Sequence, residues 1–123
     1  MPEVDLKERP WRLHVLDMIE YSEKVLAYTE GMDRQAFIAD GLIYDAALRN
    51  LQLMGEAAKR IPDEVRQAHS EIPWHALIGT PVHLTHSYLT ICDSIVWCVI
   101  QENVPDLLPA LRNLLKSAAA NRE

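Results

Sequence analysis

Residues 40–62 read DGLIYDAALRNLQLMGEAAKRIP, and this stretch determines the fold class. Its apolar side chains recur three or four positions apart, which is the spacing of one face of an α-helix. Six positions carry the pattern: Ile43, Ala47, Leu51, Met54, Ala58 and Ile61. Pro62 cannot continue a helix, so we predict one long amphipathic helix from about Asp40 to Ile61.

The sequence before this helix has the same periodicity. Over residues 9–29 the apolar side chains follow one helical face, namely Val15, Met18, Ile19, Val25 and Leu26. Pro10 suits the first turn, where its missing N–H costs nothing, and Gly31 is a natural stop. Asp33 can cap a short helix that runs through Phe37.

Helical segments also follow the long helix, first as short turns over residues 63–69 and 72–79. Thr80 and Pro81 have the residue types of an N-cap and a first helical position, so a helix is predicted from there to about residue 102. Pro105 then opens a last, leucine-rich helix. No alternating strand pattern occurs. The sequence therefore predicts a single all-α domain over residues 1–123, an antiparallel helical bundle of four to five main helices plus short helical turns.

The composition limits the class of protein. A hydrophobic fraction of 49% in 123 residues suits one domain with a substantial core. No apolar run reaches the ~18 residues of a membrane span, and the acidic start MPEVD is unlike a signal peptide, so a cytoplasmic protein is expected. The net charge of −6 argues against a general nucleic-acid binder, but not against an enzyme that contacts a few nucleotides in a cleft.

Two sets of apolar side chains need an explanation beyond the helical stripes. Cys92 and Cys98 are six positions apart, on opposite sides of a helix, so they are predicted to be buried thiols without a disulfide. Trp11, Leu53 and Trp97 fall outside the main stripes. They would either complete a monomer core or face a second subunit in a homodimer, and the pattern alone favours neither.

Residues 79–93 read GTPVHLTHSYLTICD and gather three chemically active side chains near one predicted helix start: His83, His86 and Tyr88. Histidine is the usual general acid or base near neutral pH, and a helix N-terminus attracts phosphate. Together these features suit phosphodiester chemistry without a metal. Two alternatives remain: a metal held by the two histidines, for which no third ligand stands at a convincing spacing, and ordinary solvated histidines.

Two polar residues interrupt the long helix of residues 40–62. Asn50 falls on the apolar stripe and is expected to be buried and hydrogen-bonded, most simply as a tie between helices. Glu56 is either a surface residue or a link to the helix that carries the histidines. Both are candidate supporting residues rather than catalytic ones.

The order of motifs resembles the HepT-like branch of the HEPN superfamily. The resemblance spans about residues 12–108 and is carried by six pieces: Leu16-Asp17-Met18-Ile19, Asp45-Ala46-Ala47-Leu48-Arg49-Asn50-Leu51, Gly55-Glu56-Ala57-Ala58, Ile72-Pro73-Trp74, His86-Ser87-Tyr88 and Ile95-Val96-Trp97. It implies a helical bundle that forms a homodimer, with two copies of the site facing one cleft. It also implies a toxin of a toxin–antitoxin pair that cuts RNA with no metal and no cofactor.

The resemblance further implies roles for individual residues. His86 and Tyr88 stand at the catalytic positions of the family's R-N-x-x-x-H-x-Y signature. The implied partner is a nucleotidyltransferase antitoxin of the MNT type, which silences the toxin by adding AMP to the tyrosine, here Tyr88. The signature is degenerate, however, because Pro81 and Val82 occupy its first two positions. His83 is a candidate substitute for the missing positive charge.

Three functions are consistent with the sequence. The first is a HepT-like endoribonuclease toxin that uses His86. The second is a catalytically inactive relative that binds and regulates the nucleotidyltransferase, which the degenerate positions and the acidic charge favour. The third is a protein that binds a nucleotide or another small ligand between its helices.

Overall fold

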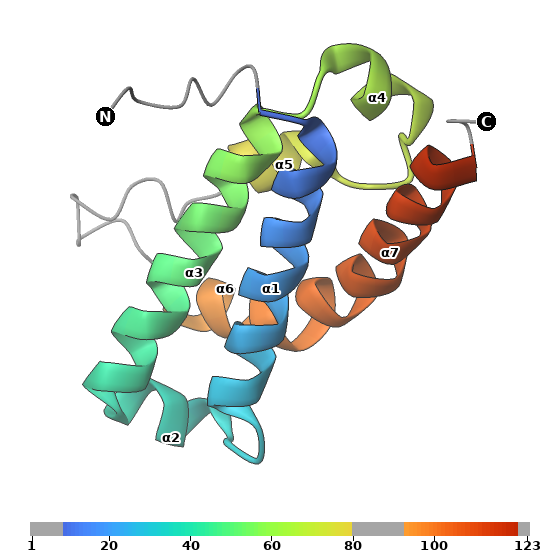
Figure 1. Cartoon of the computed structure of the whole chain (residues 1–123). Helices are drawn as coiled ribbons and strands as arrows, with labels where there is room; N and C mark the ends of the chain where they lie inside the picture. Colours follow the sequence, from blue (N-terminus) through green and yellow to red (C-terminus); the bar gives the residue numbers. More distant parts are fainter. Residues whose placement is uncertain (1–8, 80–92, 121–123) are drawn as a thin grey trace, which may run out of the picture.

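The computed structural model describes residues 9–79 and 93–120, with side chains up to residue 117, and in these ranges the chain is helical and contains no strand (Figure 1). The all-α prediction is confirmed. The predicted helix start at Thr80 and Pro81 lies outside the described residues. In chain order the elements are α1 (Trp11–Thr29), α2 (Arg34–Ala39), α3 (Gly41–Lys59), α4 (Asp63–Ala68), α5 (Trp74–Ile78), α6 (Asp93–Cys98), the π-helix η3 (Val99–Asn103) and α7 (Val104–Ala120).

Helix α1 is the centre of the bundle. It packs against α3 and against α7, and it runs antiparallel to both (Figure 1). The seams between these helices are filled by fully buried side chains, among them Val15 and Met18 of α1, Met54 of α3, and Leu111 and Leu114 of α7. The predicted apolar stripes therefore face one another in a common core.

Capping residues set the end of α1 and the starts of α2 and α3. Gly31 and Asp33 were predicted in these roles, whereas Asp40 was predicted only as the approximate start of the long helix. Gly31 has a φ of +77°, a conformation that favours glycine, and the chain reverses there after α1. The Asp33 carboxylate accepts a hydrogen bond of 2.8 Å from Ala36 N and starts α2. The Asp40 carboxylate accepts one of 3.1 Å from Ile43 N and starts α3. Three short-range signals thus position the two antiparallel helices.

Helices α6 and α7 are joined without a break through the π-helix η3. The predicted last helix begins at Val104, one residue before Pro105, whose ring nitrogen has no hydrogen to donate. Immediately before it, the Val104 N–H bonds to the carbonyl of Val99, five residues back. This wider turn moves the preceding carbonyls away from the proline ring, and the helix changes direction there (Figure 1).

An aromatic cluster joins α2, α3 and α6. The Phe37 ring lies 5.2 Å from the ring of Tyr44 and 5.2 Å from that of Trp97, measured between centroids. Trp97 and Trp11 both pack, partly buried, against the main core. The sequence left open whether these tryptophans complete the monomer core or face a second subunit. Their contacts in the described chain favour a contribution to the monomer core. In the described residues, no helix has the length and apolar character needed to span a membrane.

Candidate functional site

The structure describes two of the seven predicted site residues. Asn50 and Glu56 lie on α3, and their surroundings follow below. Pro81, Val82, His83, His86 and Tyr88 lie outside the described residues, as does Cys92. The structure therefore describes the helices before and after the H-x-Y motif, but not the motif itself.

Asn50 is buried, as predicted, with 8% of its surface exposed. Its side-chain nitrogen donates a hydrogen bond of 2.8 Å to the carbonyl oxygen of Ala46, one turn earlier in α3. The amide N–H is thus satisfied within its own helix, and this bond does not tie two helices together. Burying a polar amide without such a partner would cost a few kcal/mol, on the order of 1–3.

Glu56 lies on the exposed side of α3, with about half of its side-chain surface accessible (47%). Its carboxylate accepts a hydrogen bond of 3.2 Å from Lys59 Nζ. Its backbone oxygen accepts one of 3.0 Å from the Arg60 guanidinium. These contacts agree with the surface role; the helix that carries the histidines lies outside the described residues, so a link between it and Glu56 stays a prediction. An exposed pair of this kind is worth at most about 1 kcal/mol.

Both described flanks of residues 80–92 are attached to α3. On one side α5 packs against α3, and the Trp74 indole N–H donates a 3.0 Å hydrogen bond to His69 O. On the other side the Tyr44 hydroxyl of α3 donates a 2.5 Å hydrogen bond to the Asp93 carboxylate at the start of α6. Sequence reasoning missed Tyr44 and Asp93, because nothing local indicates a bond between residues 49 positions apart.

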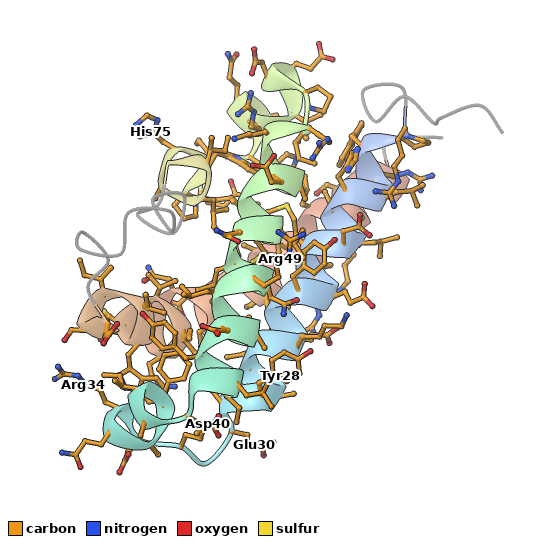
Figure 2. All side chains as sticks on the ribbon, turned by 90° about the vertical axis from the view of Figure 1, so that its left-hand side faces the viewer. Tyr28, Glu30, Arg34, Asp40, Arg49 and His75 are labelled. Carbon is orange, nitrogen blue, oxygen red and sulfur yellow. The ribbon has the colours of Figure 1, made fainter. Side chains whose placement is uncertain are left out.

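The face of the molecule shown in Figure 2 carries basic side chains from three elements. Arg34, Arg49 and His75 lie on α2, α3 and α5, and all three are exposed. Within the described part of the chain, neither arginine forms an ion pair. Asp40 and Glu30 lie on the same face (Figure 2). The face is therefore mixed in charge, with Arg49 as an exposed guanidinium available to an anionic ligand.

The remaining candidate groups are metal ligands and the thiol of Cys98. In residues 9–79 and 93–117, no group of three histidine, cysteine or acidic side chains is arranged to hold a metal ion. Cys98 forms no disulfide, but the prediction that it is buried was wrong. Its sulfur is exposed and donates a hydrogen bond to Glu102 Oε2 at 2.9 Å, because position 98 of the α6–η3 run faces solvent.

Comparison with known proteins assigns the chain to a family. The family model described as "Ribonuclease HepT-like" matches residues 18–114. The chain is 30% identical over 108 residues, 88% of its length, to a Caldanaerobacter subterraneus protein named "Putative RNase TTE0752", and covers 94% of that protein. It is 28% identical to "Putative RNase MJ1216" of Methanocaldococcus jannaschii, over 100% of this chain and 98% of that protein.

A third relative bears the family name itself. The chain is 28% identical over 109 residues to "Probable ribonuclease HepT" of Thermococcus cleftensis, which is 89% of this chain and 99% of that protein. No solved structure matches the chain. The matched region contains nearly all of the described core and the whole H-x-Y segment. The chain belongs to the HepT-like ribonuclease family.

Proposed function

We propose that this protein is a metal-independent endoribonuclease of the HepT type, with His86 as the general acid or base and Tyr88 assisting at the phosphate. One observation carries the proposal: the family match over residues 18–114 includes an intact H-x-Y motif at residues 86–88. Histidine is suited to proton transfer during phosphodiester cleavage, since its pKa lies near neutrality.

The activity is expected to be slow. Pro81 stands where the family signature has an arginine, and neither proline nor valine has a side chain that can donate a hydrogen bond to the phosphoryl oxygens. Losing one such electrostatic group commonly lowers the rate by ~10²–10³. His83 is the candidate substitute within the motif, and exposed Arg49 of α3 is the candidate contact to the RNA backbone.

The biological setting we propose is a toxin–antitoxin pair in the cytoplasm. The protein would act as a homodimer, and its antitoxin would be a nucleotidyltransferase of the MNT type that adds AMP to Tyr88. Support for this setting comes from the family membership and from the retained tyrosine at position 88. Incubation with such a partner and ATP should add the mass of one adenylyl group to the parent chain and none to Tyr88→Phe.

The ribonuclease is tested by incubating the purified protein, in the presence of a metal chelator, with total tRNA and with an mRNA transcript. The parent is compared with His86→Ala and with the matched control His75→Ala, which removes an exposed histidine of α5 outside the motif. Cleavage by the parent and the control, but not by His86→Ala, supports the proposal. Equal cleavage by all three proteins would rule out His86 as the catalytic group.

A second function is favoured by Pro81 and Val82 and by the net charge of −6: an inactive subunit that binds and regulates the nucleotidyltransferase. A well-folded parent that cuts neither RNA would favour this function. The double variant Pro81→Arg, Val82→Asn restores the family signature. It should then gain cleavage that His86→Ala abolishes, whereas a double variant that stays inactive would show that the signature alone is not the missing part.

A further inference from the structure

A cavity of about 280 Å³ lies where α3, α5, η3 and α7 meet. It is larger than the roughly 150 Å³ apolar cavity that binds benzene in an engineered protein. Most of its lining is apolar, and the buried part of that lining comes from Leu51 and Met54 of α3 and from Val104 and Leu107 at the start of α7. The cavity therefore has a buried apolar floor that can hold a ring or a short hydrocarbon.

The polar groups of the cavity are carboxylates and one amide. Glu71, Asn103 and Asp106 complete the lining, and all three are exposed, which places them toward the solvent side of the buried floor. Among the described residues, no lysine or arginine lines the cavity. A phosphate would face two carboxylates here, so a nucleotide is a poor match for this cavity.

The wall formed by η3 is irregular in a way that supports a binding role. Val99 and Asn103, the first and last residues of the π-helix, both line the cavity. π-Helical turns are rare, and they occur frequently at functional sites. The same turn accommodates Pro105, so the backbone that shapes this wall is fixed by the sequence that follows it.

We propose that this cavity binds a small organic cation: an ammonium group on an apolar body. The apolar body occupies the floor formed by α3 and α7, and the ammonium group lies between Glu71 and Asp106, with the Asn103 amide as a further acceptor. One neighbour competes for Glu71, because the His69 ring nitrogen lies 3.5 Å from its carboxylate. Asp106 forms no ion pair within the described residues, and it is the principal anion for the ligand. This site does not depend on the proposed ribonuclease activity.

Three probes with the same ring separate charge from apolar burial: 2-phenylethylamine, 2-phenylethanol and 3-phenylpropionate. Binding to the full chain is followed by calorimetry and by the shift in melting temperature. The amine should bind about tenfold more tightly than the alcohol, since hydrogen bonds between charged groups are stronger than those of a neutral hydroxyl, and the carboxylate should bind most weakly. Equal affinity for the three probes, or binding of none, would overturn the proposal.

Two variants locate the site. Glu71→Gln with Asp106→Asn should remove the preference for the amine and keep the affinity for the alcohol. The matched control is Asp45→Asn with Glu64→Gln, which neutralises two exposed carboxylates outside the cavity and should leave all affinities unchanged. Ala110→Leu fills the cavity from α7 and should abolish binding of every probe without lowering the melting temperature. Retention of the amine preference in the Glu71/Asp106 variant would refute the assignment.

Discussion

At the scale of single residues, Cys98 shows how one contact sets the reactivity of an exposed thiol. The Cys98 sulfur lies 2.9 Å from Glu102 Oε2, one turn further along the helix. The pKa of Cys98 is raised, chiefly by this hydrogen bond, then by desolvation and by the negative charge of Glu102. All three causes favour the neutral thiol over the thiolate, which is the nucleophile.

Glu102→Gln is therefore expected to make Cys98 more reactive. Removing the negative charge lowers the pKa of Cys98, so at a fixed neutral pH more thiolate is present and the pH profile of alkylation moves to lower pH. The rate of iodoacetamide labelling, measured by mass spectrometry in a Cys92→Ser background, checks this. If the variant is labelled no faster than the parent at any pH, Glu102 is not the cause of the raised pKa of Cys98.

At the scale of the elements, Asp40 serves two helices at once. Its backbone N–H donates to the carbonyl oxygens of Ala36 and Phe37 at the end of α2, at 3.1 and 3.3 Å. Its carboxylate accepts from Ile43 N at the start of α3. Side-chain caps of this kind are worth about 0.5–2 kcal/mol.

Asp40→Ala should lower the free energy of unfolding by about 1 kcal/mol, because it removes only the cap on α3. Asp40→Asn keeps an acceptor oxygen and should come within a few tenths of a kcal/mol of the parent. Urea unfolding followed by circular dichroism measures both. If the two variants lost the same stability, the negative charge rather than the hydrogen bond would be responsible.

Pro109 lies inside α7, and its replacement should stabilise the protein. A proline inside a helix costs ~3 kcal/mol, partly offset by the ~0.4–1 kcal/mol by which it restricts the unfolded chain. Pro109 is exposed, so Pro109→Ala leaves no cavity. The free energy of unfolding is expected to rise by about 2 kcal/mol, as measured by thermal unfolding. Asn113→Ala, an exposed change in the same helix, should gain no more than about 0.7 kcal/mol.

A lower melting temperature in Pro109→Ala would mean that Pro109 is needed for the packing of α7 against α1. The matched change at Asn113 separates this outcome from a general effect of alanine in α7.

The helices could be predicted from the sequence because their signals are local. Apolar periodicity, the cap at Asp33, and Gly31 predict α1 to α3 within a few residues, whereas the cap at Asp40 came from the structure. The π-helix η3 could not be predicted, since it is a response of the backbone to Pro105 within packed surroundings. The bond between Tyr44 and Asp93 and the cavity were missed for a similar reason, because both depend on how distant elements meet.

For the candidate site, the sequence predicted the burial of Asn50, which the structure confirms. It left the role of Glu56 open; the contact with Lys59 agrees with the surface role, and a link to the helix that carries the histidines stays a prediction. It placed Cys98 in the core, which was wrong, because an uninterrupted apolar stretch does not show on which side a helix meets its neighbours. The roles assigned to His86, Tyr88 and His83 stay predictions.

At the scale of the whole molecule, the outer side of α1 carries exposed apolar side chains. Leu13 and Leu16 lie one turn apart, with 39% and 47% of their surfaces accessible. Such a pair on a helix suits contact with a second subunit. We therefore expect light scattering to give twice the chain mass of 14.0 kDa at micromolar concentration.

Leu16→Glu should shift this mass toward the monomer, because it places a charge in the expected interface. Leu42→Glu is the control: Leu42 is 82% exposed but stands apart in the first turn of α3, and the change should leave the mass unaltered. A monomer mass for the parent at every concentration would contradict the dimer, and an unaltered Leu16→Glu dimer would exclude this face of α1.

The packing of α7 on α1 has a consequence for the order in which the chain is made. The ion pair between Glu23 and Arg112 joins residues 89 positions apart, and the buried Leu111 and Leu114 belong to α7, which leaves the ribosome after the other described helices. Until then α1 and α3 can pair, but the opposite side of α1 stays uncovered. A chain stopped before residue 111 leaves that apolar surface open, so the unfinished product is a substrate for chaperones and proteases rather than a smaller version of the protein.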